Sequence, residues 1–169
     1  MPYFTNSQDL DIYYETKGNT SGKVLLFLNG AGTPHNMWNP VVDRLKGQYR
    51  CVTFDYRGYG NSDTSIYNSM AWCAFDAKEL IEHLELQEKK VTLVGASMGV
   101  SVLLGYFKAY QDLYVDRIII CDQSPCVTSR ADWKFGRLQG AQDKDMLLDE
   151  MTQMFHDKVN FGFEEQRRM

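Results

Sequence analysis

Apolar residues along the chain form short runs that alternate with stretches of helical spacing. Residues 24–28 are a continuous apolar run, which is typical of a strand buried on both faces of a sheet. Residues 69–86 instead place Trp72, Leu80 and Leu84 at helical spacing, which indicates an amphipathic helix. Because strands alternate with helices, we predict an α/β protein with a mostly parallel sheet and flanking helices. The expected strands are 11–16, 24–28, 51–54, 91–94 and 117–121, and the expected helices are 37–45, 69–86 and 99–110.

The composition of the chain changes after residue 127. Methionine and charged residues become frequent there, whereas valine and isoleucine nearly disappear. Residues 131–158 show the apolar spacing of one or two helices, and no further strand is evident. We therefore divide the chain into an α/β core over residues 1–127 and an incomplete helical cap or lid over residues 128–169.

Charge and composition argue against a nucleic-acid partner and against a segment that spans a membrane. The chain has 169 residues, of which 44% are hydrophobic and 24% are charged, as in ordinary soluble globular proteins. Its net charge of −4 argues against a nucleic-acid partner, which would favour a basic face. No apolar run is long enough to cross a membrane, and the first residues lack the pattern of a signal peptide. A cytoplasmic location is expected.

The four cysteines give no indication of a metal site. Cys51, Cys73, Cys121 and Cys126 form no CxxC pair, and no histidine lies at a spacing suited to zinc. Two of them fall within apolar runs, where a free thiol behaves as a small buried hydrophobic group. We expect reduced structural thiols, with no metal and no organic cofactor.

The stretch from Gly95 to Gly99, Gly-Ala-Ser-Met-Gly, fits the pattern G-x-S-x-G. It lies between a predicted strand and a predicted helix, where a strained turn crowds the residues beside the serine, so small glycines are needed. The start of the following helix points N–H groups toward negative charge that develops there. The pattern predicts Ser97 as a nucleophile; the alternative is a serine in an ordinary strand-to-helix turn.

Two further motifs occur in the chain, each at the carboxyl end of a predicted strand. They are LFLNGAG at residues 26–32 and FDYRGYGNSD at residues 54–63. The third motif is LVGASMG at residues 93–99, which contains the G-x-S-x-G stretch described above. With these three motifs in this order, the sequence resembles the α/β-hydrolase superfamily over most of its length up to Pro125. The resemblance implies an α/β-hydrolase-type sheet that ends, in this chain, after the sixth strand and the start of a cap.

The resemblance also implies roles for individual residues. Ser97 would be the nucleophile, and the backbone N–H groups of Ala31 and Met98 would form the oxyanion hole. Residues 29–36, the equivalent of the superfamily's oxyanion loop, are called the oxyanion loop below. Asp55 and Arg57 would hold loops together. The residues expected to line a substrate pocket are Gly30, His35 and Trp38.

The sequence departs from the superfamily pattern at two positions. Many relatives have His-Gly where this chain has Asn29-Gly30, and an asparagine there can still form local hydrogen bonds. Many also have a second glycine after the serine turn, where this chain has Val100. A serine at position 97 in place of an aspartate speaks against epoxide hydrolase or haloalkane dehalogenase chemistry.

Asp122 is the candidate for the catalytic acid. It follows the last predicted strand, in the run Ile120-Cys121-Asp122-Gln123-Ser124-Pro125. This run resembles the same segment in cofactor-free dioxygenases of the superfamily, where the aspartate orients a histidine. The alternative is that Asp122 caps the loop before Pro125.

A serine nucleophile requires a base, usually a histidine. The chain has three histidines, and none of them lies where the base is expected. His35 lies in the oxyanion loop, on the wrong side for proton transfer, and His83 lies on a helix away from the strand ends. His156 keeps the chain order Ser, Asp, His but falls in a predicted helix. The resemblance instead places the histidine in a loop beyond two further strands, outside this sequence. The uncovered edge of the sixth strand would then imply self-association, a second polypeptide that completes the sheet, or a sequence that is a fragment of a longer chain.

Taken together, the expected function is a serine hydrolase that cleaves a small ester, thioester or activated carbonyl compound through an acyl-serine intermediate. A cofactor-independent dioxygenase of the same fold is one alternative. A ligand-binding protein that keeps the hydrolase scaffold without turnover is the other.

Overall fold

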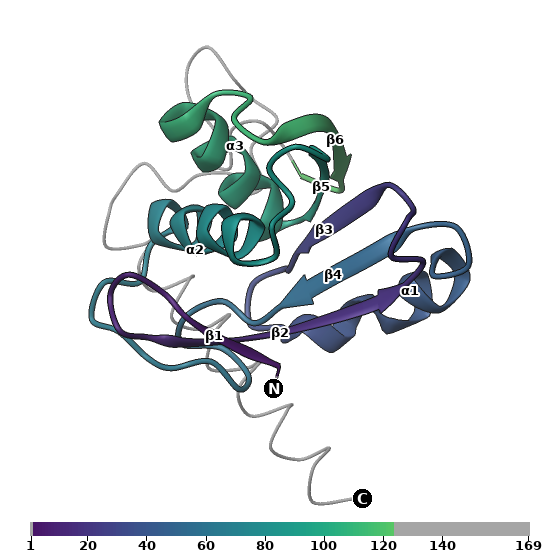
Figure 1. Cartoon of the computed structure of the whole chain (residues 1–169). Coiled ribbons are helices and arrows are strands. Elements are labelled where there is room, and N and C mark those ends of the chain that lie inside the picture. The colour runs from purple at the N-terminus through teal and green to yellow at the C-terminus, as the bar shows by residue number, and fades with distance from the viewer. Residues whose placement is uncertain (1, 124–169) are drawn as a thin grey trace, which may run out of the picture. The chain divides into compact units, whose positions relative to one another are not determined.

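The computed structural model of the chain describes residues 2–123 (Figure 1). In this part the strands form one sheet in the order β1-β2-β4-β3-β5-β6. The predicted boundary near Val127, the predicted cap and His156 lie outside the described residues. The strands are β1 (Tyr3–Thr5), β2 (Asp11–Gly18), β3 (Val24–Leu28), β4 (Arg50–Phe54), β5 (Val91–Ala96) and β6 (Val115–Cys121). The helices are the short 3₁₀ helix η1 (His35–Trp38), α1 (Asn39–Leu45), α2 (Met70–His83) and α3 (Met98–Tyr110).

Strands β4, β3, β5 and β6 are parallel, whereas β1 and β2 form an antiparallel hairpin at one edge, with β2 also antiparallel to β4. The prediction of a mostly parallel α/β sheet is therefore confirmed. Strand β1 was not predicted, because three residues are too few to show a period of two. Strand β5 extends past Val94 because Gly95 also pairs, with Leu28 on one side and Ile120 on the other.

Strand β3 consists of a continuous apolar run because both of its faces are buried. Val24, Leu26 and Leu28 belong to the apolar cluster that includes α2 and α3. Leu25 and Phe27 belong to a second cluster with residues of η1 and α1. Successive side chains of a strand point to opposite faces, so β3 is buried on both sides, between the helices that Figure 1 shows on either face of the sheet.

Helices α2 and α1 each begin with a residue that is favoured at the start of a helix. Ser69 precedes α2, and its side chain accepts a hydrogen bond from the Trp72 N–H group at 3.4 Å, which satisfies one of the free donors of the first turn. The helix predicted over residues 37–45 is divided into η1 and α1. Pro40 lies in the first turn of α1, where a residue without an N–H group is tolerated.

Strand β6 has one unpaired edge in the described part of the chain. It pairs with β5 alone, and Ile118, Ile119 and Ile120 are 42%, 46% and 50% exposed. Because neighbouring side chains of a strand point to opposite faces, apolar surface is exposed on both sides of the sheet here. Within residues 2–123, the sixth strand thus has the uncovered edge that was expected.

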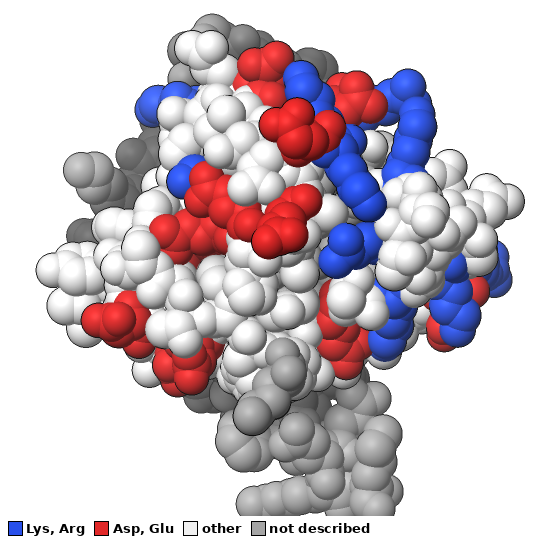
Figure 2. Space-filling view, viewed as in Figure 1, with Lys and Arg blue, Asp and Glu red and all other residues white. Residues whose placement is uncertain are grey.

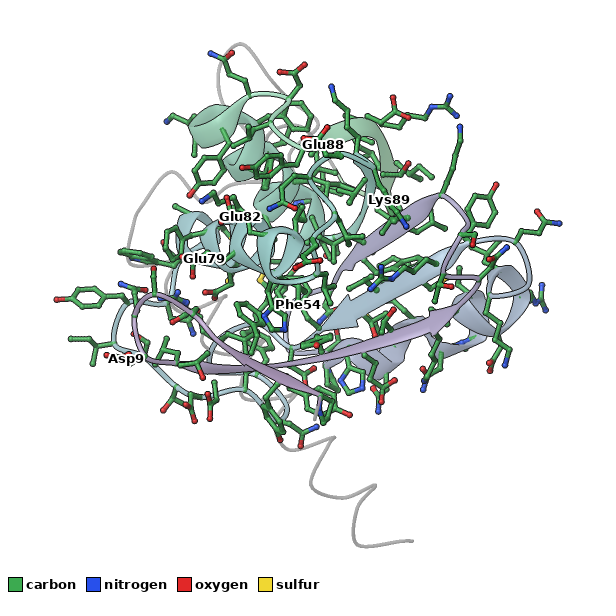
Figure 3. All side chains as sticks on the ribbon, in the orientation of Figure 1. Asp9, Phe54, Glu79, Glu82, Glu88 and Lys89 are labelled. Atoms are coloured by element: carbon green, nitrogen blue, oxygen red, sulfur yellow. The ribbon has the colours of Figure 1, made fainter. Side chains whose placement is uncertain are left out.

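Charged side chains of both signs share the face of the molecule in Figure 2. One cluster of acidic side chains lies over α2, where Glu79 and Glu82 lie (Figure 3), and other acidic side chains are spread over the same face. Within residues 2–123, no helix combines the length and the apolar character that a membrane span needs.

Candidate active site

Ser97 lies between the end of β5 and the first residue of α3. Its φ of 50° and ψ of −119° fall in a region that non-glycine residues rarely adopt, at a cost of about 1–3 kcal/mol. The turn is held by two backbone bonds: the Ser97 N–H donates to the Cys121 carbonyl (3.1 Å), and the Val100 N–H donates to the Ser97 carbonyl (2.9 Å). The chain therefore maintains a strained, half-buried serine at the carboxyl edge of the sheet.

The two glycines of the G-x-S-x-G motif are required by close backbone contacts. A Cβ atom added at Gly95 would lie 2.8 Å from the Gly99 carbonyl oxygen. One added at Gly99 would lie 2.1 Å from the carbonyl oxygen of Leu28. Any larger residue at Gly99 would push the start of α3 away from the end of β3, so these glycines allow the serine turn to sit against the oxyanion loop.

Asn29 anchors the oxyanion loop where β3 ends. Its side chain is fully buried, with Nδ2 donating to the Phe54 carbonyl (2.7 Å) and Oδ1 accepting from Trp38 Nε1 (3.0 Å). Its backbone carbonyl accepts from the Tyr56 hydroxyl at 3.2 Å. An amide supplies both a donor and an acceptor, so asparagine forms the local hydrogen bonds expected at this departure from the superfamily pattern.

The oxyanion loop runs beside the serine turn. A Cβ atom added at Gly30 would lie 3.8 Å from the Cβ of Ser97, and Ala31 packs against the main core. Met98 occupies the first turn of α3, where N–H groups have no acceptor within the helix. The structure brings these residues together at one edge, and the assignment of the Ala31 and Met98 amides to an oxyanion hole stays a prediction.

Substituting Gly30 by alanine tests whether the oxyanion loop borders the reacting centre at Ser97. The added methyl group meets only ordinary contacts, at 3.5 Å from Thr33 Oγ1 and 3.8 Å from Ser97 Cβ. We expect the free energy of unfolding to stay unchanged or to rise by up to about 1 kcal/mol. The rate of reaction at Ser97 with a fluorophosphonate should fall about 10- to 100-fold, because the methyl group displaces the reacting carbonyl or phosphonyl group.

Gly47→Ala is the matched control for this variant, because a Cβ atom there would meet no atom within 4 Å. Denaturant unfolding and the labelling rate should be measured for both variants. Equal labelling rates for Gly30→Ala and Gly47→Ala would show that Gly30 does not border the reacting centre.

His35 and Trp38 are both buried, and their ring nitrogens are engaged within the protein. The His35 N–H group and ring Nδ1 lie 2.6 and 2.9 Å from Asp55 Oδ1, and Nε2 lies 3.5 Å from Glu15 Oε1. Trp38 bonds to Asn29 and packs on Phe27. These contacts give both residues a role in positioning η1; their place in a substrate pocket stays a prediction.

Arg57 and Asp76 form a fully buried ion pair beneath the loop that follows β4. Arg57 Nε donates to Asp76 Oδ2 and Nη2 donates to Asp76 Oδ1, each at 2.7 Å. The Arg57 guanidinium also lies 5.0 Å from the Trp72 ring centroid. The second aspartate of this region, Asp55, accepts from the Asn61 N–H group at 2.9 Å. The structural roles expected for Asp55 and Arg57 are confirmed.

Burial keeps the hydroxyl and thiol groups of this region protonated. Burial raises the pKa of Tyr56 well above its usual value and also raises the pKa of Tyr59. It raises the pKa of the Cys73 thiol to about 12. Tyr59 accordingly acts as a donor, with its hydroxyl 3.7 Å from the sulfur of Met98.

Asp122 directly follows β6 and is exposed, with a φ of 50°. Because the carbonyl of the preceding Cys121 accepts from the Ser97 N–H group, Asp122 lies at the same edge of the sheet as the serine. Within residues 2–123, no hydrogen bond joins a histidine to Ser97 or Asp122. His83 instead stacks on Phe4, with ring centroids 5.3 Å apart. The roles of Asp122 and His156 in catalysis stay predictions.

A shallow hollow of about 330 Å³ lies elsewhere, between β1, the turn after it and α2. It contains none of the predicted site residues, and its two carboxylates have partners in the protein. Glu79 accepts from the Ser7 N–H group at 2.9 Å, and Glu82 pairs with Lys78. Both carboxylates are labelled in Figure 3. The part of the chain that the structure describes holds no group of three or more metal-ligating side chains placed to bind a metal ion.

Comparison with known proteins identifies relatives that match most of the chain. A family model described as "Alpha/beta hydrolase family" matches residues 25–168. The 3-oxoadipate enol-lactonase 1 of Acinetobacter baylyi is 28% identical over 160 residues, which are 93% of this chain and 59% of that protein. Epoxide hydrolase 2 of Caenorhabditis elegans is 30% identical over 123 residues, 70% of this chain and 34% of that protein.

Among solved structures, an esterase from Exiguobacterium antarcticum superposes with a TM-score of 0.78 at 30% identity. The match covers 96% of this chain and 59% of the esterase chain. The chain thus spans 59% of the length of both the lactonase and the esterase.

Proposed function

Because the chain belongs to the alpha/beta hydrolase family, we propose that it carries the nucleophile of a serine hydrolase for a small ester, thioester or activated carbonyl compound. The observation that carries this proposal is the strained Ser97 turn beside the oxyanion loop. Strain of this kind persists only where surrounding contacts enforce it, and it concentrates at functional sites.

In the proposed reaction, Ser97 Oγ attacks the substrate carbonyl carbon and gives its proton to a base. The Ala31 and Met98 N–H groups stabilise the negative charge on the carbonyl oxygen, and removing one such donor typically slows a reaction about 10²- to 10³-fold. The leaving group departs with the proton, and water then cleaves the acyl-serine bond. Asp122 would orient the base.

The names of the relatives support ester chemistry. An enol-lactonase and an esterase both open a bond to an acyl carbon, in a ring and in an open chain. The match to an epoxide hydrolase is compatible with the fold, but the residue at the serine turn differs from the aspartate nucleophile of that branch.

An intact-mass measurement with a fluorophosphonate tests the proposal. We expect one adduct per chain, mapped by peptide sequencing to Ser97, together with turnover of a small ester such as p-nitrophenyl acetate. Oxygen consumption with a bound aromatic substrate and no ester turnover would point to the cofactor-independent dioxygenase instead. Ligand binding with neither adduct nor turnover would show that Ser97 is not activated in this chain, as in a non-catalytic binding protein or in a hydrolase whose base lies outside this sequence.

We also propose that copies of this chain associate through β6. Fully burying an isoleucine side chain contributes about 1.5–3 kcal/mol. Ile118, Ile119 and Ile120 are exposed on a strand that has one unpaired edge within residues 2–123, which favours association. We therefore expect a Lys substitution of both Ile118 and Ile120 to lower the weight-average mass in analytical ultracentrifugation to that of a monomer.

The matched control is Ile66→Lys, which changes an isoleucine that is almost fully exposed and lies outside β6. It should leave the association unchanged. A wild-type chain that stays monomeric at about 100 μM, where micromolar affinity would be evident, would exclude self-association. A second polypeptide, or further residues of a longer chain, would then be left as the partner of this edge.

A further inference from the structure

The sulfur of Met37 is bonded to the oxyanion loop. The Gly30 N–H group donates to Met37 Sδ at 3.3 Å, and Thr33 Oγ1 lies 2.9 Å from the same sulfur. Thr33 Oγ1 also donates to the Gly30 carbonyl at 2.8 Å. A hydroxyl carries one proton, so Thr33 alternates between these acceptors, whereas the Gly30 N–H group has the sulfur as its acceptor. The thioether therefore bridges the start and the middle of the loop.

The Met37 side chain is bonded next to the predicted reacting centre and belongs to a partly exposed residue. Gly30 borders Ser97, since a Cβ atom at Gly30 would lie 3.8 Å from the Cβ of Ser97. The Met37 residue is 37% exposed, whereas Met98, beside the serine, is only 9% exposed. Met70, at the start of α2, is 39% exposed and thus matches Met37 in accessibility.

We propose that Met37 is a positioning residue of the oxyanion loop and a site of reversible oxidation that lowers the reactivity of Ser97; this rests on the proposed function. A lone pair of the thioether sulfur attacks one oxygen of a peroxide, and the O–O bond breaks. With hydrogen peroxide the other oxygen leaves as hydroxide and takes the remaining proton, so the products are methionine sulfoxide and water. The sulfur is oxidised and the peroxide is reduced.

Oxidation changes the hydrogen bonds that hold the loop. The acceptor becomes an oxygen atom one bond length farther from the Met37 side chain, and it is a stronger acceptor than the weakly accepting thioether. The Gly30 N–H and Thr33 hydroxyl groups must then move to keep a partner. A displacement on the order of 1 Å at a reacting centre can cost about 100-fold in rate. Contacts to the oxyanion form fully only in the transition state, so we expect kcat to fall while KM stays nearly constant.

The test compares the full chain with Met37→Leu and with the matched control Met70→Leu, each before and after treatment with hydrogen peroxide. Peptide mass mapping follows sulfoxide formation at Met37, Met70 and Met98, and the rate of fluorophosphonate labelling reports the reactivity of Ser97. We expect oxidation to slow labelling about 10- to 100-fold in the wild type and in Met70→Leu. Oxidation should leave the rate of Met37→Leu unchanged, and methionine sulfoxide reductases should restore the wild-type rate.

A second readout does not depend on reactivity. In ¹⁵N-labelled chain, the amide resonances of Gly30 and Thr33 should shift on oxidation of the wild type and stay in place on oxidation of Met37→Leu. Loss of labelling in oxidised Met37→Leu equal to that of the wild type would overturn the proposal, as would unshifted Gly30 and Thr33 resonances. A chain that never reacts with the fluorophosphonate, yet shows these shifts, would give no support to the proposed function in this chain while supporting the role of Met37 in holding the loop.

Discussion

Replacing Ser97 by alanine is expected to abolish adduct formation and to lower ester turnover by at least about 10⁴-fold, since the nucleophilic oxygen is removed and only binding and oxyanion contacts remain. The fold should be retained, because both backbone bonds of the turn, to Cys121 and from Val100, do not involve the side chain. Intact mass after fluorophosphonate treatment, steady-state turnover of p-nitrophenyl acetate and a thermal denaturation curve would measure these three effects.

Two further variants sharpen this experiment. Ser97→Gly should be equally inactive but more stable than Ser97→Ala by about 1–3 kcal/mol, because glycine adopts a φ of 50° without strain. Ser21→Ala, a change at an exposed serine outside the predicted site, should behave as the wild type. Full reactivity in Ser97→Ala would show that another residue is the nucleophile and would remove the basis of the proposed function.

Replacing Arg57 by methionine should lower the free energy of unfolding by about 3–5 kcal/mol, which is the usual cost of leaving one partner of a buried ion pair alone. The carboxylate of Asp76 would lose both of its 2.7 Å bonds to Arg57 and keep the 2.8 Å bond from Asn6 Nδ2. Arg57→Lys should recover only part of the loss, because an ammonium group cannot form two parallel bonds to a carboxylate. Denaturant unfolding monitored by circular dichroism would give these values.

The double variant Arg57→Met with Asp76→Asn separates the buried charge from the loss of packing. It should be more stable than Arg57→Met alone, because the remaining amide is neutral and still accepts from Asn6. Lys78→Met breaks the partly exposed pair with Glu82, one helical turn away on α2, and should cost less than about 1 kcal/mol. If Arg57→Met were no more harmful than Lys78→Met, the ion pair would not hold the loop after β4 in place.

Much of the fold followed from local patterns. The continuous run in β3, the start of α2 at Ser69 and the turn at Ser97 were predicted because each depends on a few neighbouring residues. A period of two or of 3.6 and a capping side chain are written in the sequence near the element that they form. The ends of the elements were less well predicted. Strand β5 extends through Gly95 because of pairing with β3 and β6, which lie far away along the chain.

Within the candidate site, too, some residues were predicted from the sequence, whereas their contacts with distant elements were not. The G-x-S-x-G pattern pointed to Ser97 and its flanking glycines, and the resemblance to the superfamily implied that Arg57 would hold loops together. No pattern pointed to the partner of Arg57, since Asp76 lies on a different element and looks like any other polar residue of a helix. The bond from Gly30 to the sulfur of Met37 was missed for a related reason: methionine is a common core residue, and its sulfur rarely acts as a specific acceptor.

The sequence by itself determined the α/β class and the position of the serine turn, because both arise from interactions within about ten consecutive residues. Only the tertiary structure decided which segments meet at that turn. The order of strands in the sheet brings the oxyanion loop after β3 and the end of β6 beside Ser97. It also leaves Ile118, Ile119 and Ile120 uncovered in the described part of the chain. Such contacts depend on strand order and register, which are set by the packing of the whole sheet rather than by any local run of residues.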